Sequence, residues 1–210
     1  MNCPLCNNKA VFFLSVNLIG FWKCENCGLI YKEPHSRLNR DIEKKRYLFH
    51  QNSIADRGYI DFLNQLIIPL LNFVRTEDSG LDFGCGHTPV LSEILKINSY
   101  NCDVYDPFFF PNADFSKKYD FIVSTEAFEH FFYPEKELRL ISSILKPNDI
   151  LGIMTELYDQ ISDFHNWYYH KDPTHVCFFG NKSMKFICKK YGYIIEYCDN
   201  KRVIILRKTN

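Results

Sequence analysis

The sequence of 210 residues lacks the features that mark several classes of protein. It contains no run of about 18 apolar residues, so we expect no membrane-spanning helix. No basic start is followed by an apolar stretch and a small-residue cleavage site, so we expect a cytoplasmic protein. The formal net charge is zero and no long basic stripe is present, which argues against nucleic acid as a partner. The chain also has no internal repeat and no low-complexity tract.

Cysteine, in contrast, is plentiful, with nine residues. Four of them form two Cys-x-x-Cys pairs, Cys3 with Cys6 and Cys24 with Cys27, separated by 17 residues. This spacing is typical of a four-cysteine zinc site, because each pair forms a tight turn that points two thiolates at one centre. Free or redox-active thiols are the alternative, but a redox motif needs only one Cys-x-x-Cys pair, whereas this segment has two at the spacing of a zinc site. We therefore predict a zinc ribbon over residues 1–34, with a closed structural site.

The segment Leu81–Pro89 reads as a strand that breaks into a glycine turn and restarts as a helix. Gly84 and Gly86 flank Cys85, and a backbone without side chains can approach a nucleotide-like ligand closely. The Thr-Pro pair at the end of the segment predicts a helix N-cap followed by the first helical residue. A tight turn without a ligand is the alternative reading of this pattern alone.

Two further strands are predicted downstream of the glycine turn. Cys102–Asp106 ends on an acid roughly 20 residues beyond the glycines, which suits the two hydroxyls of a ribose. Tyr119–Ser124 is the next strand, and it runs into Thr125–His130. A nicotinamide enzyme is disfavoured because Pro89 replaces the third glycine of the dinucleotide fingerprint.

The connection between these two strands is short. Only 13 residues separate Asp106 from Asp120, too few for a crossover helix and another strand. In a regular alternation of strands and helices, a helix and a third strand would follow the strand that ends at Asp106. We predict that this helix is missing and that the third strand is missing or vestigial. Phe108–Phe110 are expected to fill the core left by that helix, with a wall of an adenine pocket as the alternative.

Together these motifs resemble class I S-adenosylmethionine (SAM)-dependent methyltransferases of the type 11 and type 23 kind, whose fourth strand runs into a Glu-x-x-Glu-His segment. That segment is Glu126–His130 here, and Leu145–Asp149 is similar to the family's Leu-Lys-Pro-Gly-Gly turn. The resemblance covers residues 55 to 208. It implies an α/β fold with a Rossmann-like sheet, an antiparallel closing strand and SAM as cofactor. The implied cofactor-binding residues are Asp82, Gly84, Cys85, Gly86, Asp106, Asp114 and Glu126.

The remaining chain is assigned to supporting and acceptor-binding roles. Residues 35–58 are predicted as a charged linker with leading helices, whose Tyr47 and Phe49 would pack over the cofactor cleft. A small basic patch at Lys44–Arg46 for an anionic acceptor is the alternative. The methyltransferase domain is predicted over 59–210, and its first helix over residues 59–75 carries a kink at Pro69. The long loop 156–180 resembles a segment over the acceptor pocket of related enzymes.

Histidines supply the candidates for a general base, because their pKa lies near neutrality. His130 and His175 are the predicted catalytic residues, and His170 is a further candidate. The alternatives are a helix-start histidine bonded to a backbone group for His130, and aromatic packing for the other two.

We predict SAM-dependent methyl transfer to a small-molecule or sugar-type acceptor, beside a structural zinc site. Two alternatives remain open: an RNA or other nucleic-acid methyltransferase whose ribbon grips the nucleic acid, and a non-catalytic module that binds SAM or partners through zinc. The sequence indicates neither the acceptor nor the oligomeric state.

Overall fold

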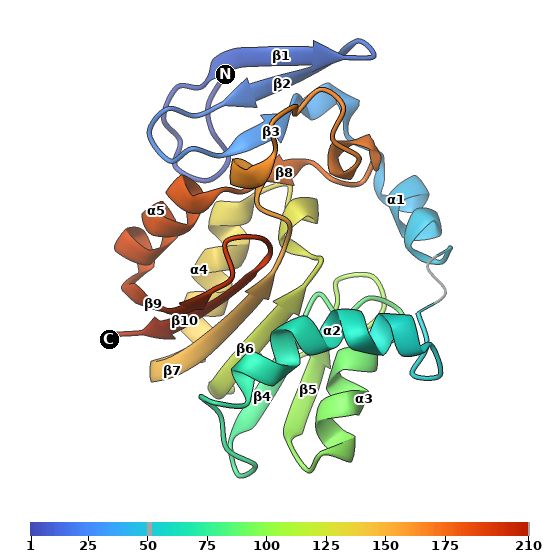
Figure 1. Cartoon of the computed structure of the whole chain (residues 1–210), viewed down its shortest axis with the longest axis vertical. Helices are drawn as coiled ribbons and strands as arrows, with labels where there is room; N and C mark the ends of the chain where they lie inside the picture. Colours follow the sequence, from blue (N-terminus) through green and yellow to red (C-terminus); the bar gives the residue numbers. More distant parts are fainter. Residues whose placement is uncertain (50–51, 210) are drawn as a thin grey trace.

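The computed structural model describes residues 1–49 and 52–209, which form two sheets (Figure 1). The smaller sheet has the antiparallel strand order β1-β2-β3-β8. Its strands are β1 (Val11–Val16), β2 (Ile19–Lys23), β3 (Ile30–Lys32) and β8 (Cys177–Phe178). The first three belong to the predicted ribbon. The fourth comes from the long loop, a pairing that the sequence analysis missed.

The larger sheet has the order β5-β4-β6-β7-β10-β9. The first four strands run parallel, β10 pairs antiparallel with β7, and β9 pairs antiparallel with β10 at the edge of the sheet. The strands are β4 (Ser79–Phe83), β5 (Asn101–Tyr105), β6 (Tyr119–Thr125), β7 (Leu145–Met154), β9 (Tyr193–Cys198) and β10 (Val203–Lys208). This arrangement confirms the predicted Rossmann-like α/β class with an antiparallel finish.

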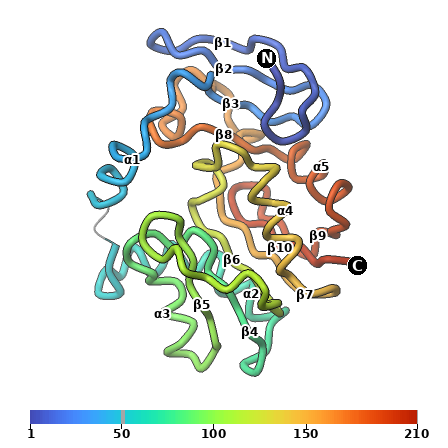
Figure 2. The backbone as a smooth tube through the Cα atoms, turned by 180° about the vertical axis from the view of Figure 1, so that it is seen from behind, coloured from blue at the N-terminus to red at the C-terminus, as the bar shows by residue number. Residues whose placement is uncertain are grey.

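Helices cover both faces of the larger sheet, as the front and back views show (Figures 1 and 2). On one face, α2 (Arg57–Leu70) and α3 (Val90–Ile97) pack with Phe121 and Val123 of β6. On the other face, α4 (Pro134–Ile144) and α5 (Asn181–Tyr191) share a core with the cysteine turns. The remaining helices are α1 (Arg40–Tyr47), η1 (Pro34–Ser36), η2 (Phe128–His130), η3 (Tyr158–Gln160) and η4 (Tyr169–Lys171).

The predicted loss of the third strand is confirmed. β5 is the edge of the larger sheet, and the residues up to β6 form two short turns, the first of them closed by an isolated bridge between Asp106 and Phe110. With no third strand beyond β5, the segment after it is free to lie against the cavity described below.

Several element boundaries differ from the predictions. α2 ends at Leu70, directly after Pro69, instead of continuing with a kink to residue 75. The proline ring cannot accommodate the carbonyl four residues earlier in a continuing helix, so the last turn closes there. α3 begins at Val90, so Pro89 lies at its N-cap position and no side chain caps the helix. β7 begins at Leu145, so Leu145–Asp149, which resembled a turn in the sequence, is part of the strand.

The ribbon, predicted over residues 1–34, shares its core with the larger sheet. Leu5 and Leu29 belong to the same buried cluster as Leu81 of β4, Leu151 of β7 and Ile187 of α5. Apolar side chains from the ribbon and from the larger sheet are therefore buried in one core, and the two parts stabilise each other. Within the two described ranges, no helix is both long and apolar enough to cross a membrane.

Candidate active site

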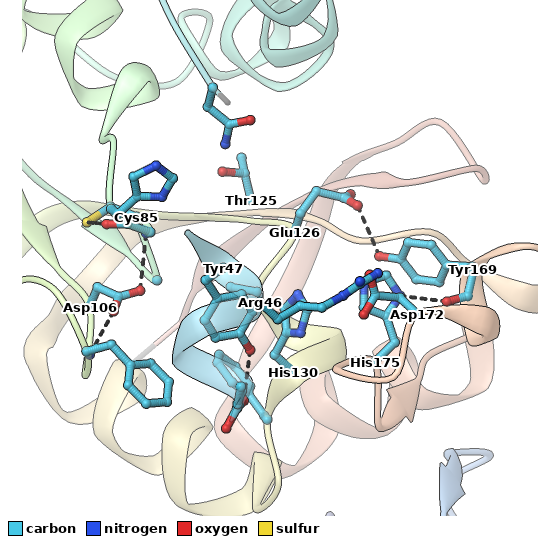
Figure 3. Close-up of a pocket in the computed structure, with 18 of the residues that line it drawn as sticks. Arg46, Tyr47, Cys85, Asp106, Thr125, Glu126, His130, Tyr169, Asp172 and His175 are labelled. Carbon is cyan, nitrogen blue, oxygen red and sulfur yellow. Dashed lines mark hydrogen bonds and ion pairs between the residues drawn. The ribbon is translucent and has the colours of Figure 1, made fainter. Parts of the chain in front are cut away.

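A cavity of about 670 Å³ lies beyond the carboxyl ends of the parallel strands. This edge is where open α/β sheets bind ligands. In Figure 3, Cys85 and Asp106 line the left side of the cavity, and Tyr169, Asp172 and His175 line the right. The cavity therefore joins the glycine turn to the long loop after β7.

The glycine turn at the end of β4 adopts a conformation that favours glycine. Gly84 and Gly86 have φ angles of 85° and 67°. A Cβ atom on Gly84 would lie 2.6 Å from the Cβ of Ala127, whereas one on Gly86 would meet nothing within 4 Å. Gly86 therefore leaves a cradle open toward the cavity, and Gly84 is required for close packing beneath it. Cys85 also lines the cavity.

Asp106 lies beside the glycine turn, at the end of β5. Its Oδ2 accepts a hydrogen bond from the Gly86 N–H at 3.2 Å. Its Oδ1 accepts from the N–H groups of Phe108 and Phe109 at 2.8 and 3.1 Å. The carboxylate thus ties the turn to the segment after β5 while lining the cavity. Phe108 lines the cavity too, so the preference for a purely core role of these phenylalanines is wrong for this residue.

Two other predicted cofactor residues lie elsewhere. Asp82 is buried in β4 beneath the turn and is not among the residues that line the cavity. Burial raises the pKa of Asp82 to about 7. Asp114 is exposed, and its carboxylate accepts hydrogen bonds from the backbone and hydroxyl of Ser116 at 2.9 and 2.6 Å. The structure therefore does not bring Asp114 to the cavity.

Glu126 follows β6 directly and lines the cavity. It is a non-glycine residue with a φ of 47°, a conformation held by its N–H bond to the Met154 carbonyl at 2.8 Å. Its Oε2 accepts from the Tyr169 hydroxyl at 3.3 Å, and its Oε1 is buried without a partner among the described residues. Burial, followed by the charge of Glu129, raises the pKa of Glu126.

His130 and His175 meet on the other side of Glu126. Their ring centroids are 4.7 Å apart, and both rings line the cavity. Each ring makes one backbone contact: His130 Nδ1 with the Thr174 carbonyl at 3.1 Å, and His175 Nδ1 with the Tyr169 carbonyl at 2.7 Å. Burial lowers the pKa of His175 to about 4. In contrast, His170 packs against Phe21 and Phe164 away from the cavity, so its prediction as a base is wrong.

Part of the cavity wall comes from the segment before the methyltransferase-like sheet. Tyr47 of α1 lines the cavity as predicted, and its hydroxyl donates to Glu43 at 2.8 Å. Phe49 does not pack there, because its side chain is 79% exposed. Arg46, from the basic cluster Lys44–Arg46, pairs with Asp172 of the long loop at 3.1 Å and so links two walls of the cavity. The sequence did not indicate this pairing.

The four cysteines of the ribbon converge on one point. Their sulfur atoms lie within 4.8 Å of one another, with Cys3 and Cys27 at 3.5 Å and Cys6 and Cys24 at 3.4 Å. Four sulfurs at zinc–sulfur bond length, arranged as a tetrahedron, would be about 3.8 Å apart. All four are free cysteines, so the donor set fits one tetrahedral zinc ion.

The doubly wound sheet, with its glycine turn and terminal acid at one cavity edge, defines a nucleotide-cofactor-binding α/β protein. Residues 49–197 match the family model described as a methyltransferase domain, and the chain belongs to this family. It is therefore a SAM-dependent methyltransferase. The cradle at Gly86 and the terminal acid Asp106 fit this cofactor.

Several solved structures have similar folds. A SAM-dependent methyltransferase from Archaeoglobus fulgidus has a TM-score of 0.54 at 19% identity, covering 78% of this chain and 99% of that one. A chain from the complex of the Haloferax volcanii Trm112 methyltransferase activator with a methyltransferase scores 0.56 at 13% identity, covering 82% and 100%.

The mitomycin 7-O-methyltransferase MmcR scores 0.51 at 12% identity over 74% of this chain. The present chain spans 59% of that enzyme. At such identities these likenesses describe the fold alone. No curated protein matches the sequence.

Proposed function

We propose that the chain transfers a methyl group from SAM to a polar small-molecule acceptor, bound between the glycine turn and the long loop. The observation that carries this proposal is the continuity of the cavity from Gly86 and Asp106 to His130 and His175. Its volume of about 670 Å³ is in the range of small-molecule pockets. A structural zinc ion in the four-cysteine site belongs to the same proposal.

Different residues along the cavity would bind the cofactor and the acceptor. Gly84–Gly86 and Asp106 would hold SAM, which when bound supplies an electrophilic methyl group on a sulfonium. Glu126 lies between this end and the acceptor end and lines the cavity. The rings of Tyr168 and Tyr169 line the acceptor end and suit a ring-bearing molecule.

A hydroxyl acceptor must lose a proton during transfer. His130 and His175 present their Nε2 atoms on this side, because their Nδ1 atoms face backbone carbonyls. Either Nε2 can take the acceptor proton, as predicted from the sequence. Placement of the acceptor supplies much of the remaining rate enhancement.

Calorimetry tests the cofactor end of the proposal. Asp106→Ala is expected to weaken SAM binding by about 1–3 kcal/mol, because charge-assisted hydrogen bonds are lost. Asp103→Ala is the matched control: Asp103 is also in β5 but pairs with Lys117 at the surface, at 2.6 Å. Equal affinities of the two variants would contradict the assignment of Asp106.

The acceptor end is tested by following the demethylated cofactor product over a panel of hydroxyl-bearing small molecules and RNA. Turnover is expected with small molecules. Turnover with RNA alone would replace this acceptor class by the nucleic-acid alternative.

A further inference from the structure

Three side chains with metal-ligand chemistry converge at the acceptor end of the cavity. One carboxylate oxygen of Glu129 and one ring nitrogen each of His130 and His175 all lie within 4.8 Å of one another. Glu129 and His130 are neighbours in η2, whereas His175 arrives from the long loop. The N–H of Val176 donates to the Glu129 carbonyl at 2.7 Å and holds the two segments together.

The two imidazoles are oriented by backbone carbonyls. The Nδ1 atoms of His130 and His175 lie 3.1 and 2.7 Å from the carbonyls of Thr174 and Tyr169. A carbonyl can only accept, so in the neutral ring the proton is on Nδ1 and the lone pair is on Nε2. Metal-binding histidines have this arrangement, with the second ring nitrogen donating to a backbone carbonyl or a carboxylate.

Glu129 supplies the third ligand atom from beneath the histidines. Its side chain is 0% exposed, and Oε2 accepts from the Thr155 hydroxyl at 2.8 Å. Oε1 is buried and has no hydrogen-bond partner in the described part of the chain. Leaving a buried carboxylate oxygen unpaired is costly, and this oxygen lies 4.0 Å from the Nε2 atom of His130.

A cation would satisfy all three groups together. A proton on His130 Nε2 is the competing arrangement, but this atom is 4.0 Å from Glu129 Oε1, beyond hydrogen-bond range. We propose that Glu129, His130 and His175 bind one divalent first-row transition metal ion. Two imidazoles and a carboxylate form a donor set that suits such ions.

The site has a consequence for the acceptor, and this part rests on the proposed methyl transfer. His130 and His175 line the cavity, whereas Glu129 lies behind them, so the open coordination positions face the acceptor. A metal ion there would bind an acceptor hydroxyl and lower its pKa, so that the hydroxyl releases its proton to solvent water before methyl transfer, in place of direct proton transfer to an imidazole. The acceptor class is therefore a small molecule with a metal-binding hydroxyl.

Binding of Mn²⁺ tests the site without SAM or acceptor. The full chain, with its ribbon zinc retained and other metal removed by mild chelation, is titrated with Mn²⁺ and free Mn²⁺ is followed by electron paramagnetic resonance. One Mn²⁺ per chain is expected. Glu129→Gln, which keeps the side-chain shape, and His175→Ala are each expected to weaken binding by at least roughly tenfold. The control His165→Ala changes an exposed histidine of the same loop and should bind as the parent does.

Circular dichroism first establishes that each protein is folded, and Glu129→Gln alone suffices if His175→Ala does not fold. The proposal is overturned if the folded parent leaves Mn²⁺ free at millimolar concentration, or if Glu129→Gln binds Mn²⁺ as tightly as the parent. Because no methyl transfer is measured, this failure differs from failure of the proposed function, which would appear as absent turnover in a chain that binds Mn²⁺.

Discussion

Asp82 illustrates how burial changes the chemistry of a single residue. Asp82 is in β4, its side chain is buried, and Oδ1 has no hydrogen-bond partner among the residues described. Burial raises its pKa to about 7, and the N–H of Ser92 acts in the opposite direction. The folded state therefore favours the protonated acid. The stabilisation from this group is complete below the unfolded pKa of 3.8 and is lost as the pH rises through 7.

Replacing Asp82 should remove this pH dependence. The Asp82→Asn variant resembles the protonated acid at every pH, so it should be more stable than the parent at alkaline pH. We expect its advantage in the free energy of unfolding to be about 2 kcal/mol larger at about pH 8.5 than at about pH 5.5. Urea denaturation at the two pH values measures this. A pH-independent difference, equal to that of the exposed control Asp103→Asn, would contradict the assignment.

At the scale of elements, the ribbon is joined to the long loop, which lines one side of the cavity and is the proposed acceptor end. β3 pairs with β8, and Lys32 of β3 donates to the Asp172 carbonyl at 2.8 Å. Asp172 and His175 both line the cavity. The ribbon therefore contributes to the position of the acceptor-side residues as well as to its own fold.

Removal of the ribbon's thiols tests both roles. The parent chain should contain about one zinc ion, and the variant with Ser at Cys3, Cys6, Cys24 and Cys27 should contain none. Because β3 supports β8, hydrogen exchange around residues 170–178 should also become faster in this variant. Elemental analysis and hydrogen-exchange mass spectrometry measure the two effects. The control Cys188→Ser with Cys198→Ser should keep its zinc, and unchanged zinc content in the quadruple variant would exclude the site.

For the molecule as a whole, the relevant feature is one core shared by the ribbon and the larger sheet. Leu5 is 0% exposed within this core, and the neighbouring Pro4 carbonyl accepts from the Glu135 N–H of α4 at 3.4 Å. Lys190 of α5 also contacts the Leu5 carbonyl, at 3.3 Å. A cavity made in the ribbon should therefore destabilise the larger sheet as well.

A pair of leucine variants tests this shared core. Leu5→Ala should lower the free energy of unfolding of the whole chain by about 2–5 kcal/mol, and hydrogen exchange in β7 should accelerate with it. Leu18 lies in the same ribbon but is 98% exposed, so Leu18→Ala should change stability by less than about 0.5 kcal/mol. Protection of β7 that survives Leu5→Ala would show that the two sheets unfold separately.

The sequence by itself determined the features that depend on short stretches of chain. The cysteine spacing predicted the cluster of four sulfurs, and the glycines before α3 predicted a turn whose φ angles are positive at both positions. The short connection after Asp106 predicted the missing strand, because chain length limits what can be built. In each case the feature is built from one continuous stretch of the chain.

Only the tertiary structure decided which distant segments meet. His175 lies beside His130 because the chain returns from β7 over the strand ends, and the two residues are 45 positions apart. The pairing of β3 with β8 and the exclusion of Asp114 from the cavity follow from the same folding of the chain. Local propensity carries no information on such contacts, because they form only when the whole core excludes water. The acceptor end of the site, with its converging Glu129, His130 and His175, belongs to this second class.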